Sequence, residues 1–274
     1  MKISVIIPTY NEEKNIADCI NSLKNQSIKD FEIIVVDDGS IDNTIEILKK
    51  LQIKVLEQKH LGPGAARNLG AKNAKGDILV FVDADMTFDS NFLRKLTEPI
   101  RENKTIGTFS KDELVSNWKN VWAKCWNINE NLPEKRRLPL NYPNHQKVFR
   151  AILKSEFDRV GGFSKGGYTD DYTLSKKLGV EADVVENAVY YHKNPDTLYE
   201  VFKQAKWVGK REYKLGFIGK IIALFRSSFP ISIIIGFLKS SKIKNWQFLR
   251  FKLAYDFGIF LGILEMIITG KTAK

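Results

Sequence analysis

The sequence has little cysteine, and this scarcity argues against two classes of protein. Only two of the 274 residues are cysteines, Cys19 and Cys125. Two distant thiols cannot build the disulfide framework of a small secreted domain. No CxxC pair or cysteine–histidine cluster accompanies them, so nothing indicates a structural zinc site. We expect two reduced, packed thiols in a cytoplasmic protein.

Acidic residues are scarce relative to basic ones. Thirty-two Asp and Glu stand against 43 Lys and Arg, giving a formal net charge of +11. Residues 196–274 hold 14 basic and 5 acidic residues (+9), whereas residues 1–195 hold 29 and 27 (+2). A basic excess indicates an anionic partner such as nucleic acid, an acidic membrane or a phosphorylated substrate. Because the excess accompanies apolar segments rather than a nucleic-acid-binding motif, we favour a membrane surface and expect no nucleic-acid partner.

Uninterrupted apolar runs of membrane-spanning length are also missing. The two most apolar segments, 217–238 and 251–269, carry internal charges, each costing about 2.5–3.5 kcal/mol at the centre of a span. Apolar segments rimmed by Lys and Arg are typical of helices lying in an anionic membrane interface. We therefore expect a protein peripheral to the cytoplasmic face of the cell membrane, with a lid on a catalytic domain or a homodimer interface as alternatives. The interruptions are Lys220, Arg226 and Pro230, then Lys252, Asp256 and Glu265.

Apolar runs and helical patterns alternate over the first hundred residues. Strands that read as continuous apolar runs, separated by helices, predict a mostly parallel α/β sheet covered on both faces. Ligands of such sheets bind at the carboxyl ends of the strands. The first run is too short for the apolar region of a signal peptide, so we expect a buried strand. The expected strands are 3–7, 31–36, 53–57 and 78–82, and the expected helices are 12–24, 42–50 and 64–74.

The pattern changes in the middle of the chain. Trp118, Trp122 and Trp126 recur every four residues, which indicates one face of a helix packed in a core. The segment 132–143 holds three prolines and is expected to be a loop. The glycines of 161–167 indicate a mobile or tightly turned segment.

Two carboxylates follow the expected strand 78–82. Asp83 and Asp85 stand two residues apart, so both can point into the crevice if the chain turns there. Such a pair suits a divalent cation held together with substrate phosphates. A solvated turn is the alternative, and the position at a strand end favours the metal.

A second polar motif, Asp37-Asp38-Gly39-Ser40, follows the expected strand 31–36. An aspartate there can bind a ribose hydroxyl or a base N–H. The same residue types also suit a tight turn. Both interpretations can hold, because two adjacent aspartates exceed what one turn needs.

Glycines before the third expected helix resemble the start of a dinucleotide-binding motif. Gly62 and Gly64 have the required spacing, but Arg67 replaces the third glycine, which such a motif needs for helix–strand packing. We therefore reject a dehydrogenase. A helix N-terminus with a nearby arginine still suits an anion such as a diphosphate.

Two further candidates come late in the sequence. Asp170 and Asp171 precede a helical pattern, so they can act as an N-cap or as a general base beside an acceptor hydroxyl. His192 follows an expected strand end, where it can be structural, contact a diphosphate or bind a metal.

Together these motifs resemble those of the inverting family 2 glycosyltransferases, which have a GT-A fold. The resemblance covers roughly the first 195 residues, and the ordered set of motifs is more specific than any one of them. The matching segments are Ile6-Ile7-Pro8-Thr9-Tyr10-Asn11-Glu12-Glu13, Val35-Val36-Asp37-Asp38-Gly39-Ser40 with Asp42 and Thr44, Gly64-Ala65-Ala66-Arg67-Asn68, Gly76-Asp77, Asp83-Ala84-Asp85, Gly161-Gly162-Phe163 and Asp170-Asp171-Tyr172-Thr173-Leu174.

The resemblance implies a GT-A domain, a Rossmann-like, mostly parallel sheet with flanking helices, followed by a C-terminal helical extension. Residues 1–104 would form its nucleotide-sugar-binding half and 105–195 its acceptor-binding half, with 196–274 as membrane-interfacial or oligomerising helices. It implies a catalytic base at Asp171, with Asp170 as the alternative because it replaces the family's glutamate. The metal, Mn²⁺ or Mg²⁺, would be bound by Asp85, with Asp83 and His192 as further candidate ligands. The implied donor-binding residues are Pro8, Thr9, Tyr10, Glu12, Asp38, Gly64, Arg67, Asp83 and Ala84.

The implied reaction is a single inverting displacement on a UDP- or GDP-linked sugar. The acceptor hydroxyl or phosphate would belong to a glycan or a polyprenyl-phosphate-type molecule in lipid-linked or cell-surface glycan synthesis. The segment 204–207 is similar to the QxxRW signature of processive members but is one residue short and lacks the arginine, which argues against a polymer-extending synthase. A nucleotidyltransferase and a nucleic-acid-binding protein are the alternatives. The former usually has a glycine-rich loop after the first strand, where Pro8-Thr9-Tyr10-Asn11 stands here.

Overall fold

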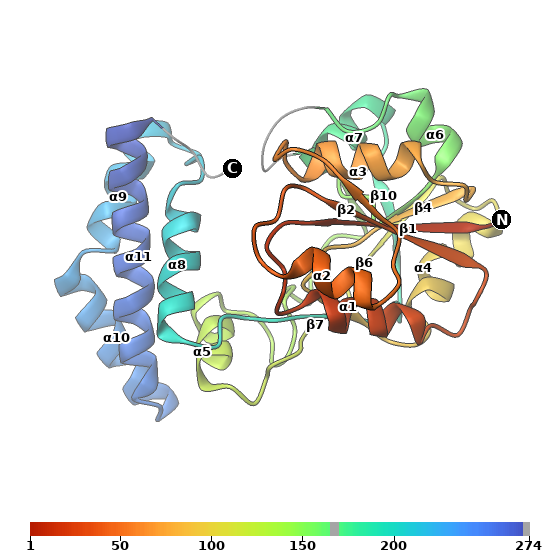
Figure 1. Ribbon diagram of the computed structural model, residues 1–274. Helices are drawn as coiled ribbons and strands as arrows, with labels where there is room; N and C mark the ends of the chain where they lie inside the picture. Colours follow the sequence, from red (N-terminus) through yellow and green to blue (C-terminus); the bar gives the residue numbers. More distant parts are fainter. Residues whose placement is uncertain (165–169, 271–274) are drawn as a thin grey trace. The chain divides into compact units, whose positions relative to one another are not determined.

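The computed structural model describes residues 1–164 and 170–270, except for the side chains of Asp170 and Asp171. The chain divides into two compact units (Figure 1). The first comprises Met1–Leu114 and Leu140–His192, and the second comprises Val115–Pro139 and Lys193–Lys274. The three-part division at residues 104 and 195 stays a prediction.

An eight-stranded, mostly parallel sheet forms the centre of the first unit, as expected. Its order is β3-β2-β1-β4-β9-β6-β10-β8. The first four of these strands are parallel, whereas β9 runs antiparallel to both β4 and β6. The carboxyl ends of β1, β2 and β4 therefore lie at one edge of the sheet. The bounds are β1 Ile3–Thr9, β2 Phe31–Asp37, β3 Val55–Glu57, β4 Ile78–Phe81, β6 Gly107–Ser110, β8 His145–Gln146, β9 Ala151–Leu153 and β10 Ala182–Val185.

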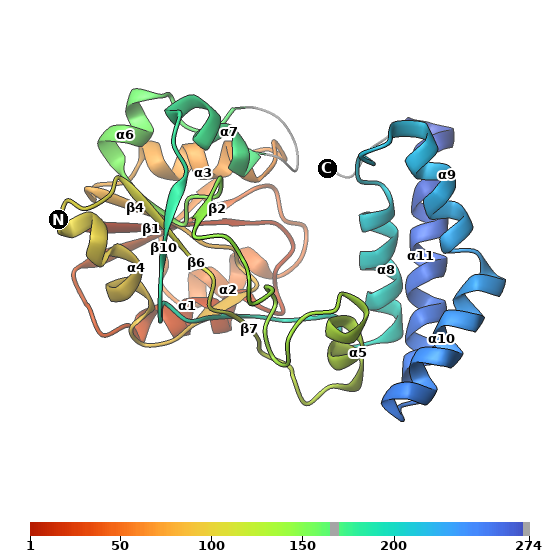
Figure 2. The same cartoon turned by 180° about the vertical axis from the view of Figure 1, so that it is seen from behind.

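Helices cover both faces of this sheet (Figures 1 and 2). The β1 side chains Ile3, Val5 and Ile7 enter the apolar core on one face, and Ile6 enters the core on the other. A strand buried on both faces has no polar side to alternate with, which explains the continuous apolar runs. The helices α1 (Ile16–Lys24), α2 (Thr44–Lys50) and α4 (Phe92–Arg101) lie on one face, and α3 (Pro63–Lys72), α6 (Lys154–Arg159) and α7 (Asp170–Leu178) on the other.

The first two helices begin later than the sequence pattern predicted. The helix expected from Glu12 begins at Ile16, and the backbone N–H of Glu12 donates to the Thr44 hydroxyl at 2.8 Å. The helix expected from Asp42 begins at Thr44, whose own N–H donates to the Asp42 carboxylate at 3.0 Å. These polar side chains hold the two helix starts together instead of extending either helix.

A small second sheet links distant segments near the same edge. Its order is β5-β11-β7, formed by Met86–Phe88, Tyr190–His192 and Glu113–Val115. β5 and β11 are antiparallel, with Met86 opposite His192. This pairing brings His192 next to the residue that follows Ala84 in the chain, Asp85.

The second unit is helical and has a separate apolar core. Its helices are α5 (Val121–Asn129), α8 (Leu198–Gly209), α9 (Gly216–Arg226), α10 (Phe229–Ile243) and α11 (Gln247–Thr269). Its core includes Trp126, Phe248 and Phe251. The prediction of a three-tryptophan helix face was wrong for Trp118, which precedes α5. The Asn120 side chain accepts hydrogen bonds from the N–H groups of residues 122 and 123, so the helix begins after it.

Candidate active site

Asp83, at the carboxyl end of β4, is held by two arginines from different elements. Its Oδ1 accepts a hydrogen bond from Arg67 Nη2 of α3 at 2.9 Å, and its Oδ2 accepts one from Arg150 Nη1 at 3.2 Å. Burial alone would raise the pKa of Asp83, but the two guanidinium groups and His192 hold it well below its ordinary value. Asp83 is therefore a fixed anion between two fixed cations.

Asp85 belongs to a chain of side chains that crosses the small sheet. Its Oδ2 lies 2.7 Å from His192 Nε2, and His192 Nδ1 lies 3.0 Å from Glu113 Oε1. The Tyr190 hydroxyl donates to the other Glu113 oxygen at 3.2 Å. A carboxylate on Nδ1 sets the orientation of the imidazole ring. Sequence reasoning missed Glu113, since no local pattern connects it to a histidine 79 positions away.

Glu12 lies within electrostatic range of this acidic pair. Burial raises the pKa of Glu12 to about 7, and the carboxylates of Asp85, Asp42 and Asp83 act in the same direction. The hydrogen bond that Asn15 donates to Glu12 at 2.8 Å opposes the rise. The excess of negative charge at this edge favours a cationic ligand.

Asp38, at the end of β2, anchors the loop that leads into α3. It is 3% exposed, and its carboxylate accepts hydrogen bonds from the N–H groups of Leu61 and Gly62 at 2.8 and 2.9 Å. It also pairs with His60 Nδ1 at 2.9 Å. The ring of His60 packs against the half-exposed ring of Tyr10, with centroids 4.2 Å apart. Sequence reasoning did not single out His60, although its stacking on a predicted donor-binding residue makes it a candidate for the same surface.

The remaining expected site residues lie along the same strand ends or in α3. Pro8 and Thr9 end β1, and Gly64 lies in the first turn of α3. The Thr9 hydroxyl is buried with no hydrogen-bond partner among residues 1–164 and 170–270. Ala84 is buried between the two aspartates.

The candidate bases Asp170 and Asp171 form the first turn of α7, but their side chains lie outside the described part of the structure. The segment before them is tied to α3 by Asn68, which exchanges two 2.9 Å hydrogen bonds with the backbone of Phe163. Gly162 has φ +66°, and an added Cβ would lie 2.5 Å from Asn68 Oδ1. Only glycine fits there without strain, and this explains one glycine of the glycine-rich segment 161–167. The predicted mobility of 165–167 falls outside the described residues.

The candidate metal-ligating side chains suit a divalent cation only in part. Asp85 Oδ2 and His192 Nε2 contact each other at 2.7 Å, whereas the two arginines engage Asp83. Within the described part of the chain, no group of three or more His, Cys, Asp or Glu residues could hold a metal ion by itself. Mg²⁺ and Mn²⁺ are commonly held by one or two side chains together with substrate phosphates. Asp85 and His192 are therefore the candidate side chains for a cation that arrives with a diphosphate.

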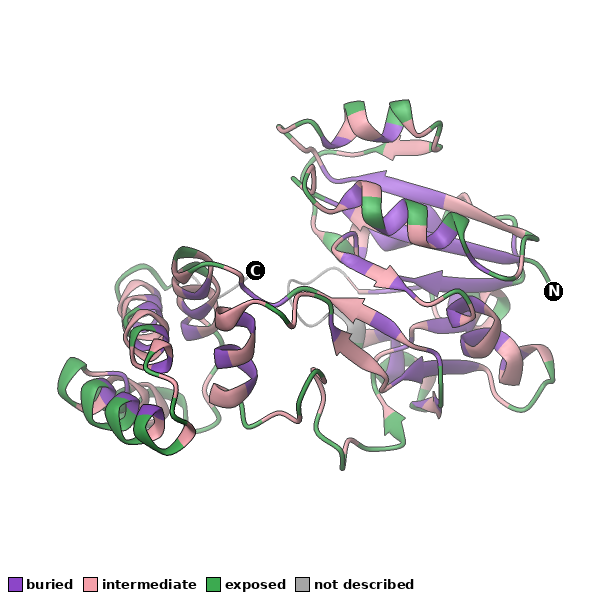
Figure 3. Ribbon diagram, turned by 90° about the horizontal axis from the view of Figure 1, so that it is seen from below, coloured by how far each residue is buried: buried purple, intermediate pink, exposed green. Residues whose placement is uncertain are grey.

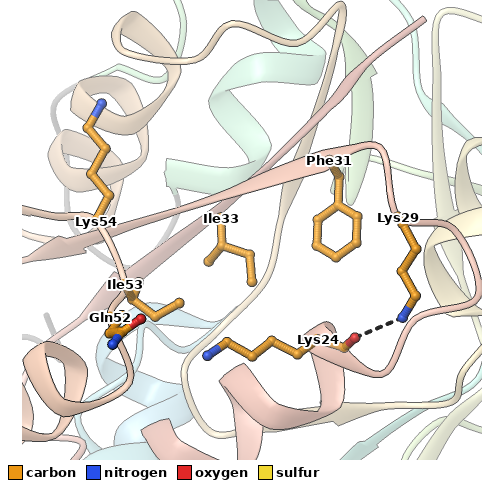
Figure 4. A pocket seen from close by; sticks show the side chains of 7 residues that line it. All are labelled: Lys24, Lys29, Phe31, Ile33, Gln52, Ile53 and Lys54. Atoms are coloured by element: carbon orange, nitrogen blue, oxygen red, sulfur yellow. Dashed lines mark hydrogen bonds between the residues drawn. The ribbon is translucent and has the colours of Figure 1, made fainter.

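A cavity elsewhere in the first unit is distinct from this site. It has a volume of about 380 Å³ and contains Phe31 and Ile33 of β2 (Figure 4). Lys29 Nζ donates to the Lys24 carbonyl at 3.1 Å at its rim. Phe31 begins β2 and Asp37 ends it, so the cavity lies toward the opposite edge of the sheet. The other lining residues are Gln52, Ile53 and Lys54.

The parallel sheet and the acidic motif at its strand ends are those of a GT-A-type α/β fold. The family model for glycosyl transferase family 2 matches residues 4–161. The chain therefore belongs to family 2 of the glycosyltransferases, as the sequence motifs predicted.

Among curated relatives, a poly(ribitol-phosphate) beta-glucosyltransferase of Bacillus spizizenii is 41% identical over 201 residues, covering 67% of this chain and 31% of that protein. Glycosyltransferase GlyA of Streptococcus pneumoniae is 39% identical over 201 residues, covering 65% and 29%. TarS of Staphylococcus aureus, a poly(ribitol-phosphate) beta-N-acetylglucosaminyltransferase, is 40% identical over 111 residues, covering 38% and 19%. The chain thus matches less than a third of the length of each of these relatives.

Two solved structures share the fold at low sequence identity. A TarS structure in complex with UDP-GlcNAc matches with a TM-score of 0.57 and 19% identity, covering 100% of this chain and 93% of that one. The mannosyltransferase PcManGT of Pyrobaculum calidifontis, in complex with GDP-Man and Mn²⁺, matches with a TM-score of 0.62 and 17% identity, covering 98% and 88%. These matches confirm the predicted fold class, while the individual site residues stay predictions.

Proposed function

We propose that this chain transfers a sugar from a nucleoside-diphosphate sugar to an acceptor hydroxyl or phosphate, with inversion and with Mn²⁺ or Mg²⁺. The observation that carries the proposal is the convergence of Asp83, Asp85 and Arg67 at one edge of the parallel sheet. This is the edge at which such sheets bind nucleotides. Solved relatives of the same fold carry UDP-GlcNAc and GDP-Man, which supports a UDP- or GDP-linked donor.

The donor's nucleoside would lie over the ends of β1 and β2. Tyr10 offers an exposed aromatic ring for the base, and His60 stiffens that ring by stacking on it. Asp38 orders the loop before α3, so the N-terminus of that helix stays in place beside the diphosphate. Arg67 would orient the diphosphate from α3 while remaining paired with Asp83.

Asp85 and His192 would hold the cation, with Glu113 fixing the imidazole ring. When bound, the cation would neutralise the negative charge that develops on the leaving diphosphate. Glu12 would contribute its charge to the same region once its proton is lost. Asp83 would keep the two arginines in position on either side.

Asp171 would remove the proton from the acceptor hydroxyl as its oxygen attacks the anomeric carbon, with Asp170 as the alternative base. Attack opposite the leaving diphosphate inverts the configuration. Two of the named relatives are glycosyltransferases that act on poly(ribitol-phosphate), and the third is named only as a glycosyltransferase. The two poly(ribitol-phosphate) names support a polymeric acceptor that carries hydroxyl and phosphate groups, and our proposal is that this acceptor is a lipid-linked or cell-surface glycan.

Two variants test this assignment. Asp171→Asn should abolish transfer while leaving donor binding nearly unchanged, because it removes a base and retains the shape of the side chain. Asp170→Asn is the matched control and should retain part of the activity. Turnover of Asp171→Asn at the wild-type rate would rule out Asp171 as the base, and the reverse ranking of the two variants would assign the role to Asp170.

A further inference from the structure

The helices α9 and α10 expose apolar side chains, and α10 buries small ones, which is the reverse of a helix in water. No residue of α9 is buried. The buried residues of α10 are Ser232, Gly236 and Ser240, spaced four apart. Figure 3 shows extensive exposed surface on the C-terminal helices. The exposed apolar side chains, here called the apolar face, are Phe217, Ile218, Ile221, Ile222, Phe225, Phe229, Ile233, Ile234, Phe237 and Leu238.

Small residues and a polar bond mediate the contact of α10 with α11. A Cβ on Gly236 would lie 2.8 Å from an α11 side chain. The Ser232 hydroxyl donates to the buried Asp256 carboxylate at 2.7 Å. α8 and α11 approach similarly, since a Cβ on Gly262 would lie 2.1 Å from the Lys206 carbonyl oxygen. Close packing through small residues, with apolar side chains facing outward, is typical of helices that contact lipid.

The charge around the apolar face is predominantly basic, with Glu212 and the buried Asp256 as the flanking acidic residues. Residues 213–255 include eight basic residues and no acidic one. If a second copy covered this face, like charges would meet, which is unfavourable. Anionic headgroups complement these cations instead. The exposed basic residues are Lys214, Arg226, Lys242, Lys244 and Arg250.

The two helices are too short to cross a bilayer separately. α9 has 11 residues and α10 has 15, so at about 1.5 Å per residue they are about 17 and 23 Å long, against roughly 30 Å of hydrocarbon. No single helix among the described residues is long and apolar enough to span, although these two together meet that length and composition with a 61° bend between them. A bent pair with exposed apolar side chains on both helices can lie within one leaflet.

We propose that the apolar face of α9 and α10 docks onto an anionic lipid membrane. Its Phe, Ile and Leu side chains enter the boundary between headgroups and acyl chains, and the flanking Lys and Arg side chains contact lipid phosphates. This inference goes beyond the proposed function. Vesicle binding is measured without sugar transfer, so failure of one assignment is distinguishable from failure of the other.

The test is flotation of the full chain with vesicles of phosphatidylcholine alone and of phosphatidylcholine mixed with phosphatidylglycerol. The protein should float with the anionic vesicles, and binding should weaken at high salt because the electrostatic part is screened. Carbonate extraction of the bound protein should release it, since in-plane helices do not span.

Two sets of variants separate the apolar and electrostatic contributions. Phe217→Glu with Phe225→Glu should reduce vesicle binding by at least about tenfold, whereas the control Leu140→Glu, which changes a 76% exposed leucine of the first unit, should not. Replacing three exposed basic residues by Gln should weaken binding to anionic vesicles on the order of 100-fold, at about 1 kcal/mol each. The triple variant is Lys214→Gln, Arg226→Gln and Lys242→Gln. Its control is Lys49→Gln, Lys72→Gln and Lys176→Gln, at exposed positions of the first unit.

Three results would overturn the proposal. One is that the wild-type chain floats with neither vesicle, and another is that the Glu and Gln variants bind as the wild type does. The third is a lipid-free dimer in sedimentation analysis that Phe217→Glu converts to a monomer without affecting vesicle binding, because a second copy would then cover the apolar face.

Discussion

Replacing Glu12 by Gln should stabilise the protein at alkaline pH and not at acidic pH. The unfolded chain loses the Glu12 proton near pH 4.5, and the folded chain loses it near pH 7. Between these values the folded state binds more protons, so the contribution of Glu12 to stability falls as pH rises. The difference of 7 − 4.5 = 2.5 pKa units corresponds to roughly 3 kcal/mol at about 1.4 kcal/mol per unit. Gln retains an oxygen to accept the hydrogen bond from Asn15.

Urea unfolding at two pH values measures this effect. At about pH 8 the free energy of unfolding of Glu12→Gln should exceed that of the wild type by up to about 3 kcal/mol, and at about pH 5 by less than about 1 kcal/mol. The control is Glu181→Gln, at an exposed position, and its free energy of unfolding should match that of the wild type at both pH values. An equal gain at both pH values, or no gain at pH 8, would refute the reasoning.

Circular dichroism should follow this unfolding, because tryptophan fluorescence reports on the other unit. All five tryptophans of the sequence fall within Val115–Pro139 or Lys193–Lys274. A transition detected by fluorescence alone would therefore miss the unit that contains Glu12.

Three further predictions concern the same site. Asp83→Asn removes the negative charge that pairs with two guanidinium groups and should lower the free energy of unfolding by about 2–3 kcal/mol in urea titrations. This value is reduced from that of a fully buried pair because the Asp83 side chain is 32% exposed. An unchanged unfolding midpoint would contradict the pairing. Gly162→Ala places a Cβ against Asn68 at positive φ and should cost about 1–3 kcal/mol in the same assay, whereas a neutral result would exclude strain there. Glu113→Gln should raise the Mn²⁺ concentration needed for half-maximal activation about tenfold by loosening His192, and an unchanged value would remove Glu113 from this role.

The first hundred residues could be interpreted from sequence because their structure depends on local patterns. The apolar runs at 3–7, 31–36 and 78–82 became β1, β2 and β4, since strands buried on both faces must be apolar throughout. Glycine also carried position-specific information. A Cβ on Gly70 would lie 2.5 Å from Ile6, so α3 can approach β1 this closely only at a glycine.

The site was only partly predictable, because its geometry depends on contacts far apart in the chain. Arg150 directly precedes the antiparallel strand β9 and contacts Asp83, which is 67 positions away in the chain. No alternating pattern in the sequence predicted β9. Glu113 reaches His192 through the small sheet. Both contacts depend on strand pairing, which strands of only three residues do not specify in their own sequences.

Calorimetric titration of the full chain with UDP- and GDP-linked sugars tests the central claim most directly. With Mn²⁺ present, at least one donor should bind saturably at one site per chain, and EDTA should weaken that binding. Asp85→Asn should weaken it about tenfold or more by removing a cation ligand. Absence of binding by every donor in the presence of Mn²⁺, or equal binding in Mn²⁺ and EDTA by both the wild type and Asp85→Asn, would contradict the account.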